Sequence, residues 1–251
     1  MDGGDFSVDY AAKTLQGIVN QLELLRLIVP ATLSLFTPLP VVVTVTSAKV
    51  DDAEFHLIYK DSNALVDVLT VPDYRSVIAQ GIGVIDTILS PKCHTLLASV
   101  HYVHAALRLS AIGNTPWEFT AEILLNCVKV LEVLFGNQRD VVRSGLQQLE
   151  IPQNEIDGIF VPLLLLRNEL DVGHAKVADI PAEHRATIYA FAETVPQAVR
   201  ELVRIAIRFT QSGRWKPRNV EKAKTDDEKG LMETVQNMQV GLNARAERLK
   251  K

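Results

Sequence analysis

Apolar residues recur at helical spacing along most of the chain. In residues 8–28 four apolar side chains follow one another at steps of three and four, which predicts an amphipathic helix. From about residue 72 the same periodicity returns and lasts to about residue 210. It predicts helices over 73–89, 91–112, 116–135, 138–149, 154–171 and 182–211. Their short connections favour an up-and-down helical bundle.

Between the first helix and the bundle, three short segments have the pattern of strands. They are Val41–Thr46, Glu54–Tyr59 and Leu65–Leu69, separated by polar turns at Lys49–Ala53 and Lys60–Asn63. The predicted fold is therefore mainly α, a helical bundle with a small N-terminal helix and an antiparallel β-meander. We expect three parts: 1–71 with the helix and strands, 72–211 with the bundle, and 212–251 as a charged C-terminal tail or helix.

Several residues mark where the bundle helices begin and end. Thr115–Glu118 reads as a capping box with a proline at the first helical position, and Gly136 follows Phe135 as a helix-ending glycine. Pro162 predicts that its helix starts or kinks there, and Pro196 predicts a kink or break in the last bundle helix. The run Val161–Leu166 is apolar on every side, which is typical of a helix surrounded by others.

Composition narrows the class of protein. The chain has 251 residues, of which 47% are hydrophobic and 22% charged, which is too apolar for a disordered protein. A net charge of −4 excludes a uniformly basic nucleic-acid coat but allows a local basic surface. Two cysteines, Cys93 and Cys127, are too few for a disulfide framework or a zinc ribbon, and we expect both in the core of a cytoplasmic protein.

One uncharged segment is long enough to span a bilayer. Leu27–Ala48 contains no charged residue, but Pro38 and Pro40 forbid a regular helix there, and Val41–Thr46 is β-branched throughout. We interpret the segment as a loop followed by a buried strand, and we expect no membrane association.

The chemistry is concentrated just after the apolar run. Arg167 follows it directly, and His174 lies seven residues further on, next to Gly173. Arginine presents a fork of donors that suits phosphate, and histidine can transfer a proton near neutral pH. On one straight helix the two side chains would not converge, so a turn at Gly173 or a second copy of the chain must bring them together.

This arrangement resembles the HEPN superfamily. An arginine, a polar residue after it and a histidine a few residues on, at the end of a bundle helix, are the residues that carry the resemblance: here Arg167, Asn168 and His174. The segments Trp117–Phe119, Lys129–Gly136 and Arg139–Arg143 upstream of it also look like HEPN-type bacterial proteins. The resemblance covers about residues 90–210 and leaves out the N-terminal part and the tail.

The resemblance implies a metal-independent endoribonuclease that acts as a homodimer. In such a protein the RNA 2′-hydroxyl attacks the adjacent phosphate, Arg167 would hold that phosphate, His174 would be the acid/base and Asn168 would orient one of them. A defence or toxin–antitoxin context, with an antitoxin or effector partner, is implied in the same way. No cofactor and no metal are implied, and the chain has no P-loop, dinucleotide-binding glycine motif or nucleophile elbow.

The same residues have simpler interpretations. Arg167 and Asp171 are spaced for an ion pair on one helix, and His174 suits a helix C-terminus. The alternative function is therefore a non-catalytic helical module that binds another protein and cleaves nothing.

Three further groups of residues are candidates for other sites. His94, His101 and His104 share one helix face, where a half-buried polar stripe is favoured over a metal site. A second stripe is interpreted as a solvated face that would border the site: Glu118, Glu122, Asn126 and Lys129. The basic stretch Arg214–Lys224, with Trp215 in it, is interpreted as a charged tail or as a grip for a nucleic-acid backbone with one stacked base.

Overall fold

The structure is a computed structural model. It describes residues 25, 27–37, 40–41, 48–50, 53–55, 74–112, 119–170, 182–218, 230, 233–234, 236–238 and 240. The chain divides into two units, Met1–Arg218 and Asn219–Lys251, which are described separately.

The predicted helical bundle is confirmed. Its helices are α2 (Tyr74–Leu89), α3 (His94–Ile112), α4 (Thr120–Phe135), α5 (Arg139–Gln148), α6 (Gln153–Glu155), α7 (Val161–Leu170) and α8 (Ala182–Gln211), with the π-helical turn η1 (Ile156–Phe160) between α6 and α7. Each of the six helices predicted between residues 73 and 211 is present within a few residues of its expected bounds. The predicted capping box Thr115–Glu118 lies outside the described residues. Phe119 precedes the first residue of α4, and its side chain forms no capping hydrogen bond.

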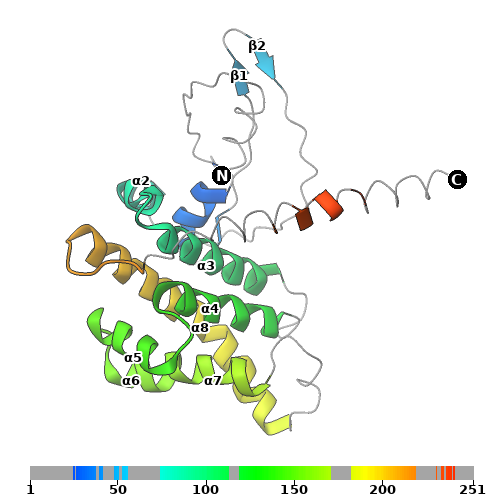
Figure 1. The fold of residues 1–251 in the computed structure, drawn as a ribbon, viewed down its shortest axis with the longest axis vertical. Helices are drawn as coiled ribbons and strands as arrows, with labels where there is room; N and C mark the ends of the chain where they lie inside the picture. Colours follow the sequence, from blue (N-terminus) through cyan, green and yellow to red (C-terminus); the bar gives the residue numbers. More distant parts are fainter. Residues whose placement is uncertain are drawn as a thin grey trace, which may run out of the picture. The chain divides into compact units, whose positions relative to one another are not determined.

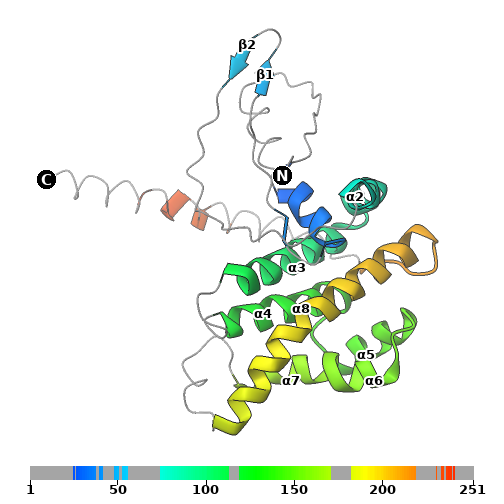
Figure 2. The same cartoon turned by 180° about the vertical axis from the view of Figure 1, so that it is seen from behind.

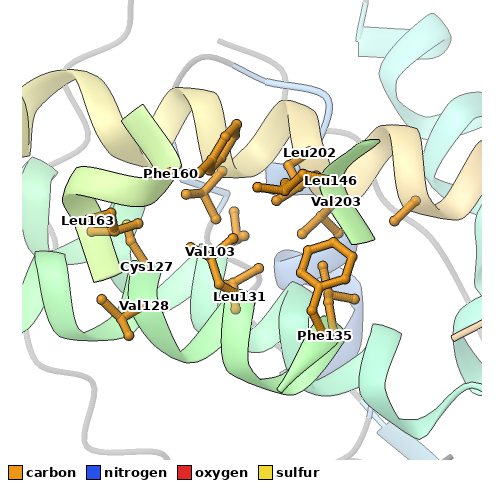
Figure 3. Close-up of a cluster of buried hydrophobic side chains, with 14 of the residues drawn as sticks. Val103, Cys127, Val128, Leu131, Phe135, Leu146, Phe160, Leu163, Leu202 and Val203 are labelled. Atoms are coloured by element: carbon orange, nitrogen blue, oxygen red, sulfur yellow. The ribbon is translucent and has the colours of Figure 1, made fainter. Parts of the chain in front are cut away.

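Helix α4 is the centre of the bundle. It packs against α3, α5, α7 and α8, and Figures 1 and 2 show it between α3 and α7 with α8 crossing them. Three of its buried side chains, Cys127, Leu131 and Leu134, are each at most 1% exposed. Figure 3 shows this core, where Leu131 and Cys127 lie among side chains such as Leu163 of α7 and Leu202 of α8.

The apolar sequence of α7 predicted a helix surrounded by others on every side, but one side of α7 is exposed. Leu163 is fully buried and Leu164 is 5% exposed, but Leu165 is 38% exposed. The helix packs on α4 and α5. The prediction of an enclosed helix was wrong because the central position in the bundle belongs to α4, which packs against four other helices, so that α7 lies at its side.

The helix continues through Pro162 by means of a π-turn. Proline has no N–H and its ring would clash with the carbonyl four residues earlier in a regular helix. In η1 the turn before it is widened, and the Val161 N–H donates to the Ile156 carbonyl, five residues back. The helix therefore neither starts at Pro162 nor breaks there.

Helix α8 also continues through its proline. It runs unbroken from Ala182 to Gln211 with Pro196 inside it. Val195 and Val199 on either side are fully buried, so tertiary packing holds this turn and the helix does not break at Pro196.

Two glycines fix the junction between α4 and α5. Gly136 ends α4 with φ 109°, a conformation that favours glycine, and its N–H donates to the Glu132 carbonyl. Gly145 of α5 faces the ring of Phe135, and a Cβ at this position would collide with that ring. The absence of a side chain therefore lets α5 lie directly against the end of α4.

An N-terminal helical segment is part of the bundle. Residues 27–34 are helical, although Leu27–Ala48 was predicted to begin as a loop. Ala31 and Leu35 enter the core, and the Arg200 guanidinium of α8 donates to the Thr37 carbonyl. The rest of the predicted 8–28 helix lies almost entirely outside the described residues.

The predicted three-stranded β-meander is wrong. The strands in the described part of the chain are β1 (Ala48–Val50) and β2 (Ala53–Phe55), which pair antiparallel with Val50 opposite Ala53. Val41, the start of the first predicted strand, is not in a strand, because its N–H donates to the Ser34 side chain instead of to a neighbouring strand. Leu65–Leu69 lies outside the described residues. Three residues of the predicted turn Lys49–Ala53 are in these strands, Lys49 and Val50 in β1 and Ala53 in β2.

In the second unit, the described residues between Gly230 and Val240 are helical. Met238 and Val240 are 61% and 67% exposed. None of the described helices is both long and apolar enough to cross a membrane.

Candidate functional site around Arg167

Arg167 lies in the second half of α7, with its side chain 40% exposed. The buried Leu163 and Leu164 fix the helix against its neighbours one turn earlier. The sequence therefore places a permanent positive charge at the surface, held by an apolar anchor.

The guanidinium of Arg167 forms an ion pair with the carboxylate of Glu132 on α4. The Glu132 side chain is 23% exposed, and its Oε1, which faces Arg167, is shielded from solvent. A guanidinium has five N–H donors, and one carboxylate engages at most two of them at once. Glu132 therefore holds the Arg167 guanidinium against α4.

The sequence did not predict Glu132 as the partner of Arg167. The local pattern suggested Asp171, four residues on, which lies outside the described residues. The available signal was an acidic residue between the apolar residues Leu131 and Leu134 of α4, where a carboxylate needs a cation from a neighbouring helix.

The other two predicted site residues are less fully described. Asn168 is in the helical backbone of α7, but its side chain is outside what the structure describes. His174 lies in residues 171–181, outside the described residues. The convergence of Arg167 and His174 thus stays a prediction.

The outer face of α4 carries the predicted polar stripe. Glu122 is exposed, while Asn126 and Lys129 are partly buried, and Glu118 lies outside the described residues. The Asn126 side chain donates to the Glu122 carbonyl at 2.8 Å. The Lys129 ammonium sits over the ring of Tyr102 on α3, 5.3 Å from its centroid. The stripe therefore runs along α4 toward Glu132 and Arg167.

The three histidines of α3 do not share one environment. His94 and His101 are exposed, whereas His104 is 7% exposed and its Nδ1 lies 3.0 Å from Ser34 Oγ. Burial, with smaller contributions from Arg108 and His101, lowers the pKa of His104 to about 4. Among the described residues, no three His, Cys, Asp or Glu side chains are grouped closely enough to hold a metal ion.

Trp215 is a core residue and not a platform for a nucleic-acid base. It is 8% exposed and meets the ring of Phe135 edge-on, with centroids 6.1 Å apart. Arg214 before it pairs with Glu150, and the Thr95 hydroxyl donates to the Arg218 carbonyl. The stretch 214–218 is therefore packed on the bundle, which corrects the interpretation of Trp215 as a base-stacking residue and of 214–218 as part of a tail. Residues 219–224 of the basic stretch lie outside the described residues, so its role as a grip for a nucleic-acid backbone stays a prediction.

Both cysteines are in the core, as predicted. Cys93 is 6% exposed and Cys127 is fully buried, and neither forms a disulfide. Burial raises the pKa of the Cys127 thiol far above its usual value.

Comparison of the chain with protein-family models, with curated proteins and with solved structures finds no match. The resemblance to the HEPN superfamily therefore stays a prediction from the residues quoted above.

Proposed function

We propose that the chain is a metal-independent endoribonuclease of HEPN type that acts as a symmetric homodimer. The observation that supports the proposal is the Arg167 guanidinium, 40% exposed at the end of an apolar helix and fixed by Glu132. A guanidinium in this setting suits a phosphodiester, because it adds a fixed positive charge where negative charge develops on phosphorus.

In the proposed reaction Arg167 binds the scissile phosphate, and Asn168 orients either Arg167 or His174. His174 takes the proton from the ribose 2′-hydroxyl, whose oxygen attacks the adjacent phosphorus. The bond from phosphorus to the 5′-oxygen breaks, and His174 of the second copy protonates the leaving oxygen. The products are a 2′,3′-cyclic phosphate and a 5′-hydroxyl, and no metal takes part.

The experiment incubates the full chain with single-stranded RNA in excess chelator and analyses the new ends. We expect cyclic-phosphate ends from the native chain, and a loss of rate of about 10²–10⁴-fold for Arg167→Ala and His174→Ala. The matched control is Arg208→Ala, which removes an exposed arginine that pairs with Glu201 on α8. Intact RNA at high protein concentration, or equal rates for all variants, would contradict the proposal.

A second candidate is a non-catalytic module that binds a partner protein such as an antitoxin or effector. The observation that favours it is the Arg167–Glu132 pair itself, because an arginine that only links α7 to α4 needs no substrate. This candidate predicts a stable complex with another protein and no cleavage. The RNA assay above therefore separates the two candidates.

A further inference from the structure

Tyr102 and Lys129 form a cluster that the proposed reaction does not use. Tyr102 on α3 is partly buried against the core, and its neighbour His101 lies with its ring centroid 5.8 Å away at a tilt of 56°. Lys129 on α4 covers the Tyr102 ring. Two aromatic rings and a cation thus meet at the surface where α3 and α4 pack together.

Lys129 has no strong anionic partner in the part of the chain that the structure describes. No described carboxylate lies within ion-pair distance of it, and its contact with the ring is a cation–π contact at a partly exposed site. Such a contact is weak compared with a direct ion pair to a phosphate. A phosphate can therefore draw the ammonium away from the ring and leave the ring face open.

The cluster adjoins Arg167 across α4. Lys129 and Glu132 are three residues apart on that helix, so their side chains are neighbours about 5–6 Å apart at Cβ. Since Glu132 binds Arg167, the two cations Lys129 and Arg167 flank the same turn of α4. Figures 1 and 2 show α3, α4 and α7 side by side in this order.

We propose that Lys129 and Tyr102 form a subsite for the nucleotide next to the scissile phosphate in single-stranded RNA. Lys129 binds the phosphate of that nucleotide, and its base stacks on the ring that Lys129 vacates. A ring of this kind accepts any base, because every base has a π-face, so the subsite confers affinity without sequence preference. The assignment rests on the proposed function, since it takes Arg167 as the ligand of the scissile phosphate.

The test measures binding of a short fluorescent single-stranded RNA by anisotropy, with each change made in the His174→Ala chain. We expect Tyr102→Leu to raise Kd about tenfold, and Tyr102→Phe to stay within about twofold because it keeps the ring. We expect Lys129→Gln to raise Kd severalfold and to reduce the slope of log Kd against log salt by about one. Lys92→Gln, a change at an exposed lysine outside the cluster, is the matched control and should leave both unchanged.

A substitution at Glu122 should change the Kd for RNA in the opposite direction and so gives an independent test. Glu122 is exposed on α4 two turns before Lys129, where its charge repels the RNA backbone. Glu122→Gln should therefore lower Kd, opposite to Lys129→Gln. The subsite is overturned if the His174→Ala chain binds no RNA, or if Lys129→Gln and Tyr102→Leu, shown to be folded by circular dichroism, bind as Lys92→Gln does.

The two proposals fail in different ways. If the native chain cleaves RNA through Arg167 but the Lys129 and Tyr102 variants keep native affinity, the subsite is wrong and the proposed function stands. If the chain cleaves nothing, yet these two variants alone weaken RNA binding, the proposed function is wrong and the surface is an RNA-binding site.

Discussion

Ser34 Oγ lies 3.0 Å from Nδ1 of His104, and both side chains are buried. The Ser34 hydroxyl donates to the Pro30 carbonyl and accepts from the Val41 N–H. With its one proton directed to Pro30, Ser34 can only accept from the imidazole, so the neutral His104 carries its proton on Nδ1. This bond joins the helical segment 27–34 to α3.

The burial of His104 predicts a dependence of stability on pH. Its folded pKa of about 4 lies below the ordinary 6.5, so between these values the unfolded chain binds a proton that the folded chain does not. The free energy of unfolding should therefore be highest above pH 6.5 and fall as the pH drops toward 4, by up to about 3 kcal/mol. Urea unfolding at a series of pH values measures this. His104→Gln, which cannot titrate, should flatten this part of the curve, and His101→Gln should not; an unchanged slope in His104→Gln would contradict the explanation.

Two glycines should respond in opposite directions to the same substitution. Gly145→Ala places a Cβ against the Phe135 ring, and we expect a loss of about 1–3 kcal/mol from overpacking. Gly83→Ala on α2 meets no atom within 4 Å, and its better helix propensity should add about 0.5–1 kcal/mol. Thermal unfolding of both variants checks this. A change in stability of the same sign for both would contradict the packing described for one of the two glycines.

Adjacent residues at the end of the bundle should differ sharply in their contribution to stability. Trp215→Ala removes a core aromatic residue and should cost about 3–5 kcal/mol. Arg214→Ala breaks an exposed ion pair with Glu150 and the contact of the guanidinium with the Phe209 ring, and should cost about 1 kcal/mol. Denaturant unfolding gives both values. A mild effect of Trp215→Ala would mean that 214–218 is not part of the core.

Helix α7 should be held mainly by apolar packing. Leu163→Ala leaves a cavity beside α4 and should cost about 2–5 kcal/mol, whereas Glu132→Gln removes a partly exposed ion pair and should cost about 1 kcal/mol. Denaturant unfolding at low and high salt separates the two effects, because only the ion pair is screened. A large, salt-sensitive loss in Glu132→Gln would show that the pair has a greater structural role.

Neither cysteine should react in the folded chain. Cys127 is fully buried and its thiol pKa is raised, so the reactive thiolate is rare and inaccessible. We expect thiol reagents to label Cys93 and Cys127 only at the rate of unfolding, measured by mass spectrometry with and without urea. Rapid labelling of the native chain at Cys127 would contradict its place in the core.

The bundle helices could be predicted because each buries one face, and burial on a helix leaves a period near 3.6 in the sequence. The strands could not, because β-propensity depends on what pairs with the segment. At Val41 a serine side chain takes the backbone N–H that a strand would have used. The burial of Trp215 could not be predicted for a similar reason. It depends on contact with the ring of Phe135, a residue far away in the sequence, and the charged neighbours of Trp215 do not indicate this contact.

The candidate site was predictable only in part. An exposed cation after an apolar helix follows from the local order of residues, so Arg167 was found. Its partner Glu132 is 35 positions earlier, and only the packing of α7 on α4 brings the two together. The same holds for Ser34 and His104, which are 70 residues apart.

Trp215 and α8 also set the order in which this protein can fold during synthesis. A nascent chain that has released α2 to α7 still lacks Leu202, Val203 and Trp215, all of which fill its core. Its partly formed bundle must then hold an open apolar surface until translation has passed Arg218 and the last segment has left the ribosome. Until that moment the unfilled core leaves apolar surface exposed, a condition that favours aggregation.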